Sequence, residues 1–122
     1  MKDEPVDLKI RTKKFALRVI KMYSSLPKST TAQVLGKQVL RSGTSVGANF
    51  REAYRARSEA EFISILGICL KELEETLYWF ELLVESKILP IEKLSSLMDE
   101  CDQLIAILTS IAKSKKRKAH TS

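Results

Sequence analysis

Four basic side chains recur between residues 37 and 55 at spacings that an α-helix would bring to one side. Lys37 and Arg55 are 18 residues apart, which is about five helical turns, so the two side chains point the same way. Arg41 and Arg51 fall about 40° to either side of that direction. Such a row of cations can follow the phosphates of a nucleic acid, and it can equally be an ordinary solvated helix face.

A second group of cations lies in the run KSKKRK near the end of the sequence. Its members are Lys113, Lys115, Lys116, Arg117 and Lys118. Lysine-rich ends are common in solubilising tails, so this run supports a nucleic-acid role only together with the first row. The sequence shows no set of exposed aromatic residues beside these cations on which bases could stack. We therefore expect phosphate contacts rather than sequence-specific base recognition.

The residues that most enzymes use are scarce in this sequence. The only histidine, His120, follows the last apolar helical pattern, so Glu-x-x-His metal pairs and Ser-His or Cys-His catalysis cannot be built. Cys69 and Cys101 lack metal-ligand spacing and fall in apolar helical patterns, which is typical of reduced core thiols. We expect a protein that is not an enzyme and that has no catalytic residues, metal or cofactor.

The elements that would position the cations are four helices. Apolar residues at alternating spacings of three and four predict helices at about 8–26, 32–56, 59–86 and 91–113. The seam of the first helix is Phe15, Val19, Met22 and Leu26, and that of the fourth is Leu94, Leu97, Cys101, Leu104, Leu108 and Ile111. Pro27 ends the first helix, and Ser58 with Glu61 forms a capping box that starts the third. Four helices joined by short loops predict an all-α fold, an up-down-up-down antiparallel four-helix bundle. The bundle is expected to be one domain over residues 1–112, followed by a basic mobile tail at 113–122.

Two of the expected core seams are unusual. The third helix has a strict heptad seam of Ile63, Leu66, Leu70, Leu73, Leu77, Phe80 and Val84. The stripe of the second helix has a small, polar middle and consists of Leu35, Val39, Ser42, Val46, Asn49 and Ala53.

Small residues crowd the middle of the second helix. Gly43 and Gly47 each cost this helix about 1 kcal/mol relative to alanine, so another backbone is expected to approach closely there, and at Ser45 and Ala48. A kink of the helix at Gly43 or Gly47 is the alternative explanation. The amide of Asn49 is expected to be satisfied by backbone groups, or by Ser42 and Ser45, and to fix the register.

The third helix carries a second set of apolar residues away from its seam. These residues are Ile65, Ile68, Trp79 and Leu82. A helix that is apolar on two faces must bury both, so the set predicts a subunit interface with Trp79 as its anchor. Scattered surface apolar residues, which are normal, are the alternative explanation.

The net charge of +6 over 122 residues is unevenly distributed. Residues 1–57 carry thirteen basic and four acidic side chains, residues 58–112 carry three and eleven, and residues 113–122 carry five and none. This asymmetry fits either an anionic partner or subunits that meet head-to-tail through opposite charges and close a ring. The start MKDEPVDLKI has no apolar signal core, and no apolar run approaches the ~20 residues of a membrane span. We expect a cytoplasmic protein with no membrane partner.

The combination of motifs resembles the bacterial four-helix-bundle proteins found in intervening sequences of large-subunit ribosomal RNA genes. The resemblance covers about residues 12–112 and includes a small Ser-rich helical turn, an Asn, a charged stretch, Ser-x-x-Glu-Phe and a Glu-Leu-Glu run. Here these are Ser42 to Ser45, Asn49, Arg51 to Ala53, Ser58 to Phe62 and Glu72 to Glu74, with Val19 to Tyr23 and Leu26-Pro27 in the first helix. The sequence departs from the family pattern at Val46-Gly47 and at Phe50-Arg51-Glu52.

The resemblance implies an all-helical ring, a homopentamer, and it brings no catalytic residues with it. The accessory proteins of diversity-generating retroelements are similar in fold, and they are basic pentameric barrels that bind nucleic acid and a reverse transcriptase. Two hypotheses follow. The first is a non-enzymatic oligomeric scaffold that binds RNA or DNA through phosphate contacts. The second is a protein–protein interaction module without a nucleic-acid role, whose basic half meets acidic surfaces of neighbouring subunits or of a partner such as a reverse transcriptase.

Overall fold

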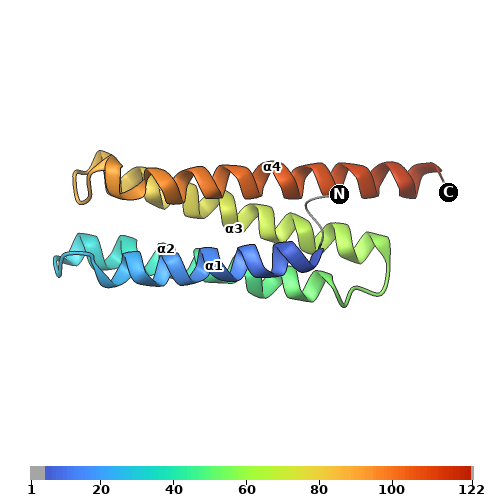
Figure 1. Ribbon diagram of the computed structural model, residues 1–122, viewed down its shortest axis with the longest axis horizontal. Helices are drawn as coiled ribbons and strands as arrows, with labels where there is room; N and C mark the ends of the chain where they lie inside the picture. The colour runs from blue at the N-terminus through green and yellow to red at the C-terminus, as the bar shows by residue number, and fades with distance from the viewer. Residues whose placement is uncertain (1–4, 122) are drawn as a thin grey trace.

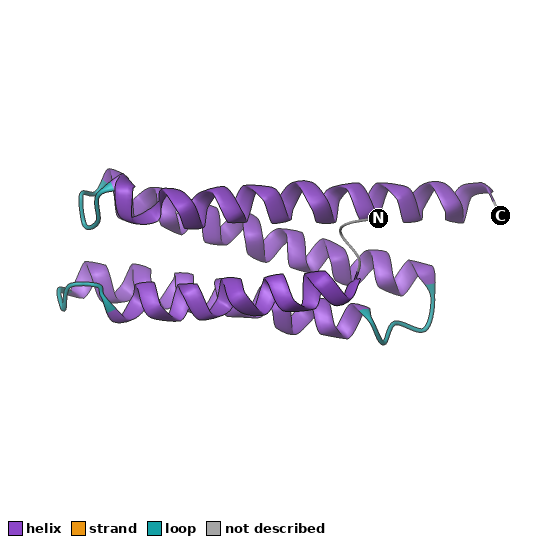
Figure 2. Cartoon of the chain, viewed as in Figure 1, coloured by secondary structure: helices purple, strands orange, loops and turns teal. Residues whose placement is uncertain are grey.

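The computed structural model describes the backbone of residues 5–121 and the side chains of residues 7–118. It contains four helices, α1 (Pro5–Ser24), α2 (Thr30–Ala53), α3 (Glu59–Glu85) and α4 (Ile91–Thr121), and none of the described residues lies in a strand. Consecutive helices run in opposite directions and are joined by short loops (Figures 1 and 2). The predicted all-α, four-helix architecture is therefore confirmed.

The helix starts follow local capping chemistry. The helix α1 begins at Pro5, three residues earlier than predicted. Proline fits this position because the N–H groups of the first helical turn have no partner within the helix, so the missing N–H of proline costs no hydrogen bond. The Ser29 hydroxyl caps α2 by accepting a hydrogen bond from the Ala32 N–H at 3.3 Å. The Ser58 hydroxyl caps α3 by accepting from the Glu61 N–H at 3.1 Å, and Glu61 reaches back to the Arg57 N–H at 2.8 Å. The capping box is confirmed, with its return bond one residue earlier than expected.

The end of α4 differs most from the prediction. This helix continues to Thr121 instead of ending near residue 113, so the basic run at 113–118 lies on a regular helix and not in an irregular tail. The physical reason is that lysine and arginine are good helix formers, and cations near a helix C-terminus interact favourably with its dipole. In Figure 1 the end of α4 extends past the other helices.

The helices follow one another around the bundle, and the side between α1 and α4 is the most open. Arg11 of α1 spans this side and donates two hydrogen bonds to the Glu100 carboxylate of α4, at 2.8 and 3.1 Å. Arg18 of α1 donates to the Ser96 hydroxyl of α4 at 2.7 Å. Polar contacts therefore join the first and last helices, whose backbones approach each other at few points.

The buried residues agree with the predicted seams of α1 and α4 more closely than with the predicted seam of α3. In α1 the predicted residues from Phe15 to Leu26 are all buried. In α3 the buried residues are Leu66, Cys69, Leu73, Thr76, Phe80 and Leu83, whereas Ile63, Leu70, Leu77 and Val84 are only half-buried. The reason is that α3 packs against both α2 and α4. Its fully buried residues therefore form a seam that is displaced around the helix axis from the predicted one.

Close packing of α1 on α2 explains two glycines. A Cβ atom at Gly43 would lie 2.9 Å from Val19 Cγ2, and one at Gly47 would lie 3.1 Å from Thr12 Oγ1. The predicted close approach is confirmed at these two positions, but Ala48 is exposed and Ser45 half-buried. The helix α2 turns its glycines towards α1. As a result Gly36 and Phe50 are buried, whereas Leu35 and Asn49, which were expected in the core, are half-buried.

A polar contact sits inside the core between α2 and α3. The hydroxyl oxygens of Ser42 and Thr76 are 2.7 Å apart, and both residues are fully buried. The Asn49 amide instead donates to the Ser45 carbonyl of its own helix at 2.9 Å, and the Ser45 hydroxyl donates to the Arg41 carbonyl at 2.6 Å. The Asn49 amide is satisfied by backbone as predicted, but this bond cannot set the register between helices.

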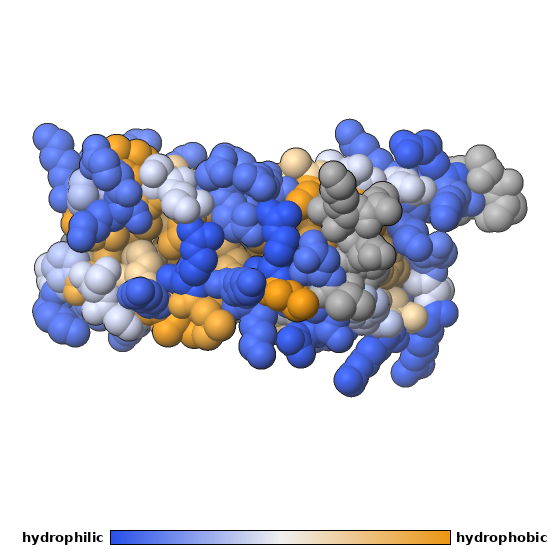
Figure 3. All heavy atoms as spheres, viewed as in Figure 1, coloured by the Kyte–Doolittle hydropathy of each residue, from blue (hydrophilic) through white to orange (hydrophobic). Residues whose placement is uncertain are grey.

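The molecular surface is mostly hydrophilic. Figure 3 shows polar side chains over most of one face, with apolar patches among them, including patches over α1 and α2. Ile10, Leu17 and Ile20 of α1 are between 43% and 55% exposed. None of the described helices combines the length and the apolar content that crossing a membrane requires.

Candidate nucleic-acid interface

A basic hollow lies on the outer side of α1 and α2. It has a volume of about 480 Å³ and is lined by Lys9, Ile10, Lys13, Lys14 and Leu17 of α1 and by Arg51 of α2. Lys13, Lys14 and Arg51 are exposed, and Lys9 is half-buried. None of the described residues that line this basic hollow is acidic. Its potential is therefore positive, and it attracts anions.

The local fold explains why these side chains meet. In α1, residues three and four apart share a face, so burying Leu8, Thr12 and Phe15 against the bundle leaves Lys9, Lys13 and Lys14 near solvent. In α2, Arg51 lies one turn after Gly47, whose missing side chain lets Thr12 of α1 approach. The close backbone contact therefore brings the Arg51 side chain to the lysines of α1.

The row of cations predicted on α2 is divided by the structure. Arg41 faces α3, where it donates to the carboxylates of Glu72 at 3.3 Å and Glu75 at 2.8 Å. Lys37 is exposed on α2, and Arg55 is exposed in the loop that follows Ala53. All four predicted cations are exposed, but Arg51 contributes to the basic hollow with α1, whereas Arg41 is paired with two acidic side chains of α3. Sequence reasoning missed the lysines of α1, although the spacing of four between Lys9 and Lys13 was visible.

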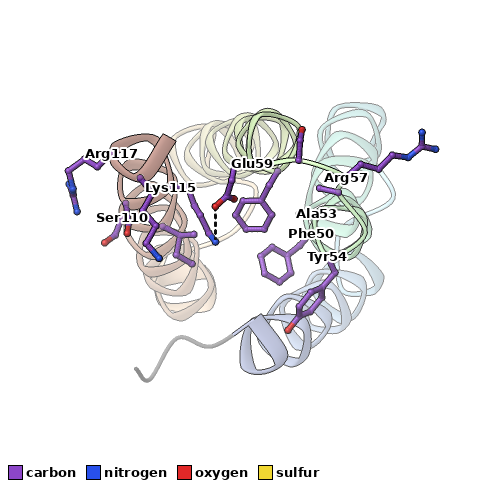
Figure 4. A pocket seen from close by; sticks show the side chains of 14 residues that line it. Phe50, Ala53, Tyr54, Arg57, Glu59, Ser110, Lys115 and Arg117 are labelled. Carbon is purple, nitrogen blue, oxygen red and sulfur yellow. Dashed lines mark ion pairs between the residues drawn. The ribbon is translucent and has the colours of Figure 1, made fainter. Parts of the chain in front are cut away.

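A second hollow lies at the end of the bundle. Its volume is about 780 Å³, and it lies between the end of α2, the start of α3 and the last turns of α4 (Figure 4). Phe50, Tyr54 and Phe62 line it together with four cations, Arg57, Lys115, Arg117 and Lys118, and one carboxylate, Glu59. Of these three rings only Tyr54 is exposed, whereas Phe62 is half-buried and Phe50 is buried, so the structure places one exposed ring, and not an exposed aromatic set, beside the cations. The sequence could not show this end hollow, because its walls come from three helices.

Two lysines contact the aromatic rings of the end hollow. The Lys115 ammonium lies 5.2 Å from the centre of the Phe62 ring and 3.5 Å from the Glu59 carboxylate. The Lys9 ammonium lies 4.8 Å from the centre of the Tyr54 ring. Both distances suit a cation–π contact. Lys9 lines the basic hollow and Tyr54 lines the end hollow, so this contact links the walls of the two hollows.

The remaining cations of the basic run lie along α4. Lys113, Lys116, Arg117 and Lys118 are exposed, whereas Lys115 is half-buried against α3. Because a helix distributes consecutive residues around its axis, the run does not present one uniform basic face.

The predicted interface residues of α3 are only partly available to a neighbour. Ile68 is 45% exposed, whereas Ile65 and Trp79 pack partly against the core and Leu82 is half-buried. The Trp79 Nε1 atom is buried and meets no hydrogen-bond acceptor among the described residues. The second apolar face is therefore narrower than predicted, because α2 and α4 cover α3 from two sides. Gly67, next to Ile68, is exposed, and a Cβ atom there would have no neighbour within 4 Å.

The two thiols are core groups, as the sequence predicted. Cys69 and Cys101 are free and fully buried, and burial raises the pKa of each thiol to about 12. At neutral pH they are therefore protonated and unreactive, since the thiolate is the nucleophile. Within the described part of the chain, no group of three or more His, Cys, Asp or Glu residues could hold a metal ion.

Comparison with known proteins places this geometry in context. The model of a family described as 23S rRNA-intervening sequence protein matches residues 6–110. A solved structure from Bacteroides thetaiotaomicron, described as a protein with unknown function from the S23 ribosomal protein family, is 42% identical, with a TM-score of 0.81. The alignment covers 86% of this chain and 97% of that one. None of the curated proteins matches the sequence. The matched range of the family model includes the whole basic hollow and ends before the basic run of α4.

Proposed function

Since the chain belongs to the 23S rRNA-intervening sequence protein family, we propose that it is a non-enzymatic, oligomeric protein that binds RNA or DNA through phosphate contacts. The resemblance found in the sequence is confirmed by the family match. The likeness to accessory proteins of diversity-generating retroelements stays a prediction, and so do a reverse transcriptase partner and a pentameric ring.

The observation that carries the proposal is the basic hollow of α1 and α2. Four cations meet there, and none of the described lining residues is acidic. Neutralising a phosphate releases condensed counterions, which supplies most of the affinity in sequence-independent binding. Ile10 and Leu17, exposed beside these cations, can cover the sugar edge of a bound strand. Lys37 and Arg55 and the exposed cations of α4 extend the positive surface beyond this hollow.

Support for an oligomer comes from the exposed face of α3. A glycine inside a helix costs about 1 kcal/mol relative to alanine, and the described fold gives Gly67 no packing reason, since its side-chain position is open. Exposed Ile68 lies beside it, and Tyr78 of the same helix is 53% exposed. A second copy that approaches closely at Gly67 would cover Ile68. Trp79, being partly packed inside its own chain, would contribute less than predicted.

The test compares two triple variants with equal changes in net charge. Lys13→Glu/Lys14→Glu/Arg51→Glu removes cations of the basic hollow, and Lys28→Glu/Lys87→Glu/Lys93→Glu removes exposed cations elsewhere. Fluorescence anisotropy with a short RNA duplex and a DNA duplex over a range of salt gives affinity and its salt slope. On the DNA duplex, the first variant is expected to lose about 0.9 of slope per phosphate contact removed. The control should keep most of the wild-type slope. Equal losses in both variants would contradict a located phosphate site.

A second candidate function is protein–protein recognition without nucleic acid. It is favoured by the acidic segment 58–112 and by the Arg41–Glu75 contact of 2.8 Å, because charges of α2 and α3 already pair within one chain. Salt separates the two candidates. High salt strips nucleic acid from an intact oligomer under the first, and it loosens the oligomer itself under the second. Light scattering at low and high salt measures this difference.

A further inference from the structure

We propose that the end hollow binds one unpaired nucleotide of a nucleic acid chain, with the base against its aromatic rings and the flanking phosphates on its cations. The inference rests on the proposed nucleic-acid function and adds to it a site for a single-stranded element.

The size and lining of the end hollow suit a planar ring. Its volume of about 780 Å³ falls within the ~300–1,000 Å³ typical of small-molecule sites. Phe50 is 2% exposed and forms part of the wall, and the Tyr54 ring stands edge-on to it with the ring centres 6.0 Å apart. Tyr54 is itself 40% exposed. Every base has a π-face, so the exposed part of the Tyr54 ring can stack on a base regardless of sequence, with Phe50 supporting it from behind.

The charges around the end hollow favour an anionic occupant. Four cations and one carboxylate line it. Figure 4 shows the Lys115 side chain near Glu59, whereas Arg57 and Arg117 extend from opposite rims away from the centre. A phosphate on either side of a bound nucleotide would meet one of these rims. Lys115 lies between a carboxylate and a ring, so it can turn towards a phosphate without leaving the wall.

Continuity with the basic hollow favours a nucleotide over an acidic peptide. Lys9 lies over the Tyr54 ring and also lines the basic hollow with Arg51. A strand whose phosphates follow the basic hollow is thereby led to the aromatic rings. A nucleic acid alternates phosphates with flat bases, so it can place phosphates in the basic hollow and a base in the end hollow. An acidic peptide would leave the aromatic wall without a planar partner.

The experiment uses one RNA duplex in two forms, blunt and with a short single-stranded extension that contains 2-aminopurine. Wild-type protein is expected to bind the extended form about tenfold more tightly and to quench the 2-aminopurine fluorescence through stacking. Tyr54→Leu should lose both the preference and the quenching while binding the blunt duplex as before. Lys115→Gln should weaken the preference. The matched control is Val34→Ala, which shortens an exposed apolar side chain of α2 outside both hollows and should behave as wild type.

Each other outcome overturns the inference in a different way. Equal binding of both RNAs without quenching rejects the nucleotide site and leaves the proposed function standing, whereas no binding of either RNA rejects both. Displacement of the extension by a polyglutamate peptide would make the site one for acidic peptides. Adenosine monophosphate that binds as tightly as the extension would assign the site to a free nucleotide and not to a chain.

Discussion

The hydroxyl oxygens of Ser42 and Thr76 lie 2.7 Å apart in the core between α2 and α3. Each hydroxyl also has a carbonyl oxygen of its own helix within reach, Gln38 at 2.9 Å for Ser42 and Glu72 at 2.7 Å for Thr76. A hydroxyl has one proton to donate, so the pair forms a chain in which one hydroxyl donates to the other and that one donates to its carbonyl. The only hydrogen bond between side chains in the described core therefore leaves no proton without an acceptor.

Removing one hydroxyl of this pair should cost little, because the other keeps its own carbonyl. Thr76→Val and Ser42→Ala are each expected to lower the unfolding free energy by about 1 kcal/mol. The double variant should show a coupling of about 0.5–1 kcal/mol in urea denaturation. Ser45→Ala is the control, since the Ser45 hydroxyl bonds only within α2 and should not couple to Thr76. A loss above ~3 kcal/mol in Thr76→Val would mean that a buried group is left unsatisfied.

The glycines of this chain should respond to alanine in opposite directions. Gly43→Ala places a Cβ atom 2.9 Å from Val19 Cγ2, and valine is stiff and fully buried there, so a loss of about 1–3 kcal/mol is expected. Gly67→Ala meets no atom of its own chain, so the dissociated chain should gain up to about 1 kcal/mol from helix propensity, whereas an oligomer packed at Gly67 should be weakened. Thermal unfolding measures both. Val19→Ala should relieve the clash, so Gly43→Ala in that background should cost less.

Arginines of one helix should differ in their effect on RNA binding. Arg51→Gln removes a cation of the basic hollow and is expected to weaken binding several-fold. Arg41→Gln should leave the affinity nearly unchanged, because Glu72 and Glu75 already neutralise this guanidinium. The two variants carry the same charge change on the same helix, so anisotropy titrations compare them directly. Equal weakening would place Arg41 at the phosphates after all.

Stability should fall at high pH through the buried thiols. Burial raises the pKa of Cys69 and of Cys101 from 9.0 to about 12 in the folded chain. The unfolded chain therefore loses these protons first, and the thiols contribute stability that is full below pH 9 and is lost as the pH rises towards 12. Urea denaturation at rising pH should show a shallower decline in Cys69→Ala/Cys101→Ala than in wild type. Alkylation by iodoacetamide at mildly alkaline pH should require unfolding, and rapid labelling of the folded protein would contradict their burial.

The sequence predicted those features that depend on neighbours along the chain. The seam from Phe15 to Leu26 was correct because α1 has one apolar face, and Ser58 with Glu61 signalled the start of α3 because capping is local. The exact phase of α3 could not be predicted, since two helices cover it. The partner of Arg41 and the placement of Tyr54 and Phe62 around one hollow depend on how the helices lie beside one another, which the periodicity of the sequence does not contain.

Every extensive helix–helix contact in the described fold joins helices that are consecutive in the sequence, whereas α1 and α4 approach each other at few points, one of which carries the Arg11–Glu100 ion pair. Native contacts therefore mostly join parts of the chain that are close in sequence. The contact between the first and the last helix is the one that spans most of the chain, and it includes the partly exposed Arg11–Glu100 ion pair. Proteins with such low contact order fold in about microseconds to milliseconds. The chain can thus form its α1–α2 pair, held by Gly43 and Gly47 against Val19 and Thr12, before the rest of the molecule is in place.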